Sequence, residues 1–114
     1  MTIFSDVKDA LGVNRDDQAF DTAIKIHLDT ELATLGQLGV FEEDVKIDPK
    51  EMSWDDLDNL SRAPGSQYFS MVKNFILLRT ILVFDPPMGS VLAHQEAITK
   101  ELTWRIREIY FHKE

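Results

Sequence analysis

The stretch from residue 67 to residue 84 constrains the fold most, because its 18 residues contain no glycine or proline and most are apolar. At 100° per residue, one broad helical face would carry Tyr68, Val72, Phe75, Ile76, Leu82 and Val83, with Leu77 and Ile81 opposite. A helix that is apolar nearly all round is buried on most of its sides. The β-branched and aromatic content leaves a short buried strand as the alternative. The pattern therefore predicts a buried helix about 27 Å long.

Two glycines indicate where two earlier helices end. Gly12 follows the short segment 4–11, and Gly39 follows a longer segment that begins near Asp17. Both occupy the position typical of the residue after a helix C-cap. The longer segment predicts an amphipathic helix over 17–38 with Asp16 or Asp17 as its N-cap, because its apolar residues recur at spacings of three, four and seven: Phe20, Ile24, Leu28, Leu35 and Leu38.

The region 40–66 has weaker periodicity and contains two helix breakers, at Pro49 and Pro64. Ser53, followed three residues later by Asp56, is typical of a helix N-cap. Trp54 and Leu57 are three residues apart and would share a face that fixes the region to the core. We expect an ordered loop with one short helix.

The last segment, residues 88–111, has two apolar stripes on opposite sides of a helix. One carries Val91, Ile98, Leu102, Ile106 and Ile109, and the other carries Ala93, Ala97, Trp104 and Phe111. One stripe can face the core, and the second requires another surface, either a loop or another protein. Before this helix, Phe84, Asp85, Pro86 and Pro87 predict a rigid turn, in which Asp85 would cap the helix through the Met88 or Gly89 amides.

Composition supports an all-α single domain over residues 1–114, a small bundle of three main helices with short helices and an ordered loop. The absence of cysteine excludes disulfides and thiolate metal sites, and no apolar stretch approaches the length of a membrane span. The beginning of the chain does not resemble a secretory signal. A formal charge of −8 disfavours both a phosphate-neutralising nucleic-acid clamp and docking on an anionic membrane.

A search for chemistry finds no catalytic motif, so we expect no enzyme activity, cofactor or metal site. The acidic run at 55–58 lacks the glycine and glutamate spacing of an EF-hand. His27 lies four residues before Glu31, which favours a helical hydrogen bond between them. Arg79, on the main apolar face of its helix, requires a partner: snorkelling to the rim, an internal carboxylate such as Asp85 or Asp21, or an acidic group on a neighbouring subunit.

The order of several short motifs resembles the head-tail connector proteins of long-tailed bacteriophages, also called adaptor or head-completion proteins. The resemblance covers residues 9–107 and rests on five motifs: Asp17 with Phe20 and Asp21, Leu35 to Val40, Trp54 to Leu57, Phe84-Asp85-Pro86-Pro87, and Glu101-Leu102-x-Trp104-Arg105-Ile106. The Phe-Asp-Pro-Pro turn with the following Glu-x-x-Trp-Arg is the most specific part.

The resemblance implies a structural virion protein at the neck, made in the host cytoplasm. Its subunits would form a ring, typically of twelve, beneath the portal, extend the DNA channel, and provide the docking surface for a stopper or tail-completion protein. DNA would pass through without specific binding, and an acidic lumen would repel its phosphates. Two apolar stripes suit a ring, in which each subunit offers different surfaces to its two neighbours.

Residues near the end of the chain are the candidate contacts with the portal or a neighbouring subunit: Trp104, Arg105, Arg107, Tyr110 and Phe111. For Trp104, burial against the 67–84 helix is the competing interpretation, since tryptophan is usually well buried. The alternative function is a small acidic regulatory protein that mimics DNA and inhibits a nucleic-acid-binding enzyme. The lysines interleaved among the acids argue against it: Lys8, Lys25, Lys46, Lys50 and Lys73.

Overall fold

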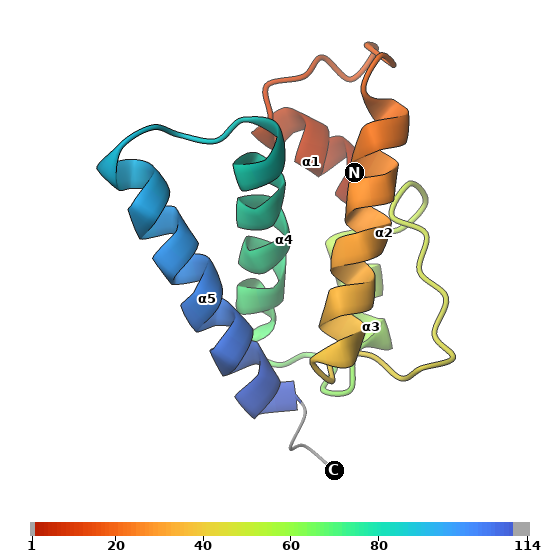
Figure 1. The fold of residues 1–114 in the computed structure, drawn as a ribbon. Coiled ribbons are helices and arrows are strands. Elements are labelled where there is room, and N and C mark those ends of the chain that lie inside the picture. The colour runs from red at the N-terminus through yellow and green to blue at the C-terminus, as the bar shows by residue number, and fades with distance from the viewer. Residues whose placement is uncertain (1, 111–114) are drawn as a thin grey trace.

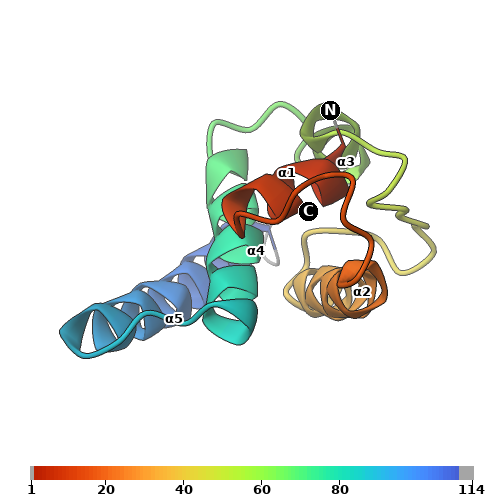
Figure 2. The same cartoon turned by 90° about the horizontal axis from the view of Figure 1, so that it is seen from above.

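The computed structural model describes residues 2–110, which form five helices: α1 (Ile3–Ala10), α2 (Asp21–Gln37), α3 (Trp54–Leu60), α4 (Phe69–Phe84) and α5 (Ser90–Tyr110). The prediction of three main helices with short helices and an ordered loop is confirmed. α4 is central: α2 and α5 lie on either side of it and run in the opposite direction (Figure 1). α1 also packs on α4, while α5 and the loop between α2 and α3 form opposite edges in both views (Figure 2). None of the described helices combines the length and apolarity that a membrane span requires.

The core collects apolar side chains from all five helices and from the start of the α2–α3 loop. Its buried members are Ile3, Phe4, Val7, Ile24, Leu28, Leu32, Leu35, Val40, Phe41, Leu57, Val72, Phe75, Ile76, Ile106 and Tyr110. In α4, the residues facing this core are Val72, Phe75, Ile76 and Thr80. The expectation that α4 is buried on most sides agrees with the structure, because its 16 residues are buried or partly buried except at Ser70, Asn74 and Val83. α5 diverges from α4 toward the turn that joins them (Figure 1), and Val83, one residue before the end of α4, is 55% exposed.

The ends of α1 and α2 follow the glycine signals, whereas the starts of α2, α4 and α5 depart from the predictions. Gly12 and Gly39 adopt φ of 73° and 96°, directly after the C-cap residues of α1 and α2. α2 begins at Asp21, and its N-cap, Phe20, has no side-chain hydrogen bond. The carboxylate of Asp17 instead accepts the Ala19 N–H at 2.9 Å within the preceding turn. The prediction of an aspartate N-cap near residue 17 is therefore wrong. α4 and α5 also begin two residues later than expected.

The short helices are fixed as the 40–66 pattern predicts. Ser53 forms a reciprocal capping box with Asp56 at the start of α3. Leu57 is fully buried, and Trp54 donates its indole N–H to Asp6 in α1 at 2.8 Å. The confirmed Trp54 and Leu57 face thus holds the loop to the core.

A buried cation organises the connection from α1 to α2. Lys8 is 2% exposed, and its ammonium donates to the carbonyls of Arg15 at 3.0 Å and Asp17 at 2.6 Å, and to the Asp21 carboxylate at 2.8 Å. An ammonium has three N–H groups, so all are satisfied. Lys8 is therefore a structural residue and is removed from the surface lysines that counted against DNA mimicry.

Candidate interaction surfaces

Trp104 lies on the face of α5 opposite the core. Two residues later on the helix, Ile106 is fully buried, and the 3.6-residue period turns Trp104 outward. Trp104 is 64% exposed, so the interpretation that it is buried against α4 is wrong. A shallow hollow beside it is lined by Tyr68, Met71, Trp104, Arg105, Glu108 and Ile109. We call Trp104, with its exposed neighbours Lys100, Arg105 and Arg107 on α5, the Trp104 surface.

The other candidate contact residues at the end of α5 divide into three cases. Arg105 and Arg107 are exposed, and Arg105 donates twice to Glu101 one turn earlier, at 3.0 and 2.7 Å. Tyr110 is fully buried and belongs to the core of the subunit. Burial raises the pKa of its phenol. Phe111 lies outside the described residues.

The turn at 84–87 ends α4 at the predicted residue. Phe84 packs against the core, and its ring makes a T-shaped contact with the His27 ring at a centroid distance of 5.5 Å. Asp85 is the C-cap, and its N–H donates to Ile81 at 2.8 Å. Within residues 2–110, the Asp85 side chain makes no hydrogen bond to the Met88 or Gly89 amide, so the expected cap of α5 is absent from this part of the chain.

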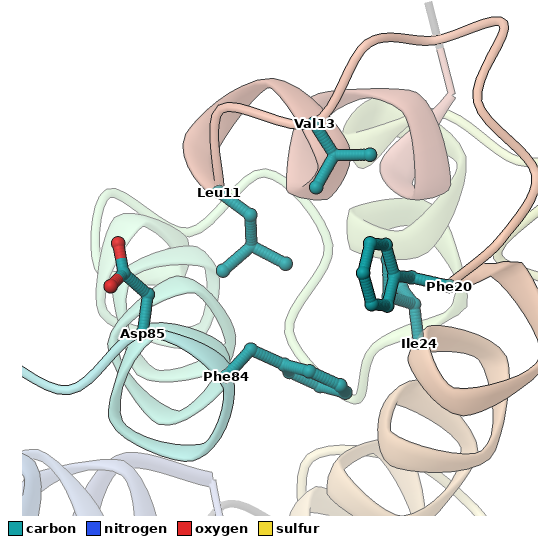
Figure 3. Close-up of a pocket in the computed structure, with 6 residues that line it drawn as sticks. All are labelled: Leu11, Val13, Phe20, Ile24, Phe84 and Asp85. Atoms are coloured by element: carbon teal, nitrogen blue, oxygen red, sulfur yellow. The ribbon is translucent and has the colours of Figure 1, made fainter.

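An apolar hollow of about 100 Å³ lies beside this turn, where the ends of α1 and α4 meet the start of α2 (Figure 3). Its lining is Leu11, Val13, Phe20, Ile24, Phe84 and Asp85. Phe20 is 51% exposed at its rim, and the sole charged side chain in the lining is Asp85. Such a hollow can accept an apolar group but contains no pair of groups for acid-base chemistry.

The partner of Arg79 is Glu31 of α2. Arg79 donates its Nε to one Glu31 oxygen at 3.1 Å and an Nη to the other at 3.4 Å, which joins α2 to α4. The interpretation that Arg79 pairs with an internal carboxylate is confirmed, but that carboxylate is Glu31 and not Asp85 or Asp21. Glu31 is 3% exposed, so the arginine offsets the cost of burying a carboxylate.

His27 also has a different partner from the one expected. Its Nε2 lies 3.1 Å from the Thr80 hydroxyl, and that hydroxyl donates to the Ile76 carbonyl at 2.7 Å. Because the hydroxyl has one proton, the His27 ring must donate to it. Burial lowers the pKa of His27; the nearby Glu31 opposes this shift and Arg79 reinforces it. The predicted pairing with Glu31 is replaced by a neutral hydrogen bond between helices.

The edge of the molecule formed by the α2–α3 loop, on the side away from α5 (Figure 1), is strongly acidic. Residues 41–58 contain eight acidic and two basic side chains, which concentrates there most of the net charge of −8. Within the described part of the chain, Glu43 and Asp44 are exposed and form no ion pair. Beside them is an open hollow of about 200 Å³, which we call the acidic-edge hollow: Asp29, Leu32, Ala33, Phe41, Glu42, Val45 and Ile47 line it.

No group of His, Asp or Glu among residues 2–110 is arranged to hold a metal ion.

The sequence patterns predicted neither the acidic-edge hollow nor the burial of Lys8. The hollow forms where α2 meets a loop without periodicity, so neither element alone shows it. The acid run Glu42-Glu43-Asp44 was the one available signal.

The model of a family described as phage connector protein matches residues 3–111, which include all five described helices. No curated protein and no solved structure gives a significant match.

Proposed function

Because the chain belongs to the phage connector family, we propose that it is a head-tail connector subunit that assembles as a ring beneath the portal. Its role is structural, as a component of the virion that interacts with portal or tail proteins. In this proposal the ring, of twelve subunits, extends the DNA channel and presents the docking surface for a stopper or tail-completion protein. The subunit waits in the host cytoplasm before assembly.

The exposure of Trp104 is the observation that supports this proposal. An indole that is 64% exposed leaves a large apolar surface in water, and tryptophan and arginine are enriched at the centres of protein interfaces. Arg105 is held beside it by Glu101, which reduces the side-chain freedom lost on binding. The Trp104 surface therefore has the composition of a binding site for the portal or another subunit.

The charge of the chain supports passage of DNA without binding. A ring of twelve subunits at −8 each would present no net attraction for phosphates. Protein contacts, in contrast, need a few well-packed anchors and tolerate a net charge of this sign.

The test is co-sedimentation of the purified protein with the portal ring from the same genome, with the bound stoichiometry measured by mass and by imaging. We expect saturable binding of one subunit per portal subunit and an added ring beneath the portal. Absence of binding by both monomer and oligomers would contradict the connector role and favour the acidic regulatory protein.

Trp104→Ala should raise the dissociation constant for the portal more than tenfold, as expected for loss of an anchor of about 2 kcal/mol. Its helical content should stay unchanged. Val91→Ala is the matched control, because Val91 is a half-exposed apolar residue near the other end of the same helix. Global unfolding of Trp104→Ala would show that this side chain stabilises the subunit instead.

A further inference from the structure

We infer that the Trp104 surface binds the acidic-edge hollow of the next copy of the chain, so that Trp104 of one subunit enters the hollow of its neighbour. This inference rests on the proposed ring and specifies its subunit contact. It assigns a second copy of the chain, and not the portal, as the partner of the Trp104 surface.

The first support is the position of the two surfaces. α5 forms one edge of the molecule, and the α2–α3 loop forms the opposite edge, with α4 and α2 between them (Figures 1 and 2). A closed ring of identical subunits needs two different, complementary patches on opposite edges, because each subunit contacts one neighbour with each patch. The Trp104 surface on α5 and the acidic-edge hollow between α2 and its following loop are two different patches of this kind, on elements to either side of α4 (Figure 1).

The second support is the match of apolar shape. Five of the seven side chains that line the acidic-edge hollow are apolar: Leu32, Ala33, Phe41, Val45 and Ile47. A buried cavity of about 150 Å³ holds a benzene ring in another protein, so an open hollow of about 200 Å³ admits an indole. Ile26, 62% exposed and two turns before Ala33, extends the apolar face of α2 beside the hollow.

The third support is charge. Asp29 and Glu42 line the hollow and pair with Lys25 and Arg62, whereas Glu43 and Asp44 follow without an ion pair in the described chain. Three cationic side chains flank Trp104 on α5, namely Lys100, Arg107 and Arg105, of which Arg105 pairs with Glu101. The α4 and α5 helices contain five basic and three acidic residues, whereas segment 41–58 contains two basic and eight acidic ones. Opposite charge around an apolar contact favours one partner and one orientation.

Cross-linking on the portal tests this arrangement, because the chain has no cysteine of its own. Lys100→Cys marks the Trp104 surface one turn from Trp104, and Glu43→Cys marks the acidic edge; both positions are exposed. The two variants are mixed, assembled on the portal and treated with a short bismaleimide. We expect a cross-linked dimer from this mixture, and none from Lys100→Cys mixed with Asp85→Cys, which marks the turn.

A substitution that fills the hollow tests the same contact without cross-linking. Ala33 is exposed on α2, so Ala33→Arg should block the hollow and repel the cationic surface without disturbing the core. Ala23→Arg is the same change at an exposed site of the same helix, ten residues away. We expect Ala33→Arg to reduce ring assembly on the portal at least tenfold and Ala23→Arg to leave it unchanged, with equal melting temperatures.

The outcomes separate this inference from the proposed function. If the unmodified protein forms a ring on the portal but the Lys100 and Glu43 pair does not cross-link, the subunit contact is wrong and the connector role stands. Normal assembly of Ala33→Arg would also overturn the contact. If Trp104→Ala subunits still form rings with each other but no longer bind the portal, the Trp104 surface belongs to the portal contact. If the unmodified protein does not bind the portal at all, the proposed function itself fails.

Discussion

Replacing Lys8 by methionine should destabilise the subunit strongly, although the two side chains are similar in length. The variant would leave three oxygens without their donor: the Arg15 and Asp17 carbonyls and the Asp21 carboxylate. Breaking a buried ion pair by removing one partner costs about 3–5 kcal/mol. The Asp21 side chain keeps 21% exposure, and water can solvate part of it, so we expect about 3 kcal/mol.

Urea unfolding followed by circular dichroism measures this free energy directly. For a chain of 114 residues, about 3 kcal/mol corresponds to a decrease of roughly 12 °C in melting temperature. Lys25→Met is the matched control, because the Lys25–Asp29 pair has a similar distance, 2.9 Å, but both side chains are nearly half exposed. That control should cost at most about 0.5 kcal/mol. A loss below about 1 kcal/mol for Lys8→Met, or equal losses for both variants, would refute the reasoning.

Three further predictions concern helix contacts and turns. Because burial lowers the pKa of His27, the fold should lose stability as pH decreases below about 6.5, where the unfolded histidine takes up a proton. His27→Gln should flatten this pH dependence of the unfolding free energy, measured by urea unfolding between pH 7.5 and about 5. An unchanged slope would contradict the prediction. Trp54→Phe removes the hydrogen bond to Asp6 and should cost about 1.5 kcal/mol, and unaltered thermal unfolding would show that this bond contributes nothing. Gly39→Ala should destabilise the fold by about 1 kcal/mol, because the φ of Gly39 is 96°. Gly36→Ala, inside α2 with open space around it, should stabilise the fold by about 0.5 kcal/mol. A stability change of the same sign for both variants would contradict the backbone argument.

Signals that depend on neighbours in sequence predicted the structure well. Gly12 and Gly39 ended their helices because positive φ is a local backbone property. Ser53 and Asp56 formed their capping box because its atoms lie within four residues. Helix starts were less accurate: α2 begins after Phe20, since the nearby Asp17 carboxylate makes a bond inside the preceding turn.

Signals that depend on the packing of distant segments were predicted less well. Arg79 required a carboxylate, but the choice of Glu31 depends on how α2 lies against α4. The same packing gave His27 a hydroxyl 53 residues away as its partner. The two stripes of α5 indicated that one face would remain uncovered, yet they could not show that Trp104 belongs to that face and Tyr110 to the core.

The way α1 is held has a consequence for the order of events during synthesis. The backbone N–H groups of Ile3 and Phe4 donate to Met52 at 2.8 Å and to Pro49 at 3.0 Å, so α1 completes its contacts with a segment made much later. At about 5–20 residues per second, the ribosome needs several seconds to make the residues between them. The α4 residues against which α1 packs come later still. The amino-terminal helix therefore stays undocked while most of the chain is made, and binding partners that need the finished subunit can distinguish it from a nascent one.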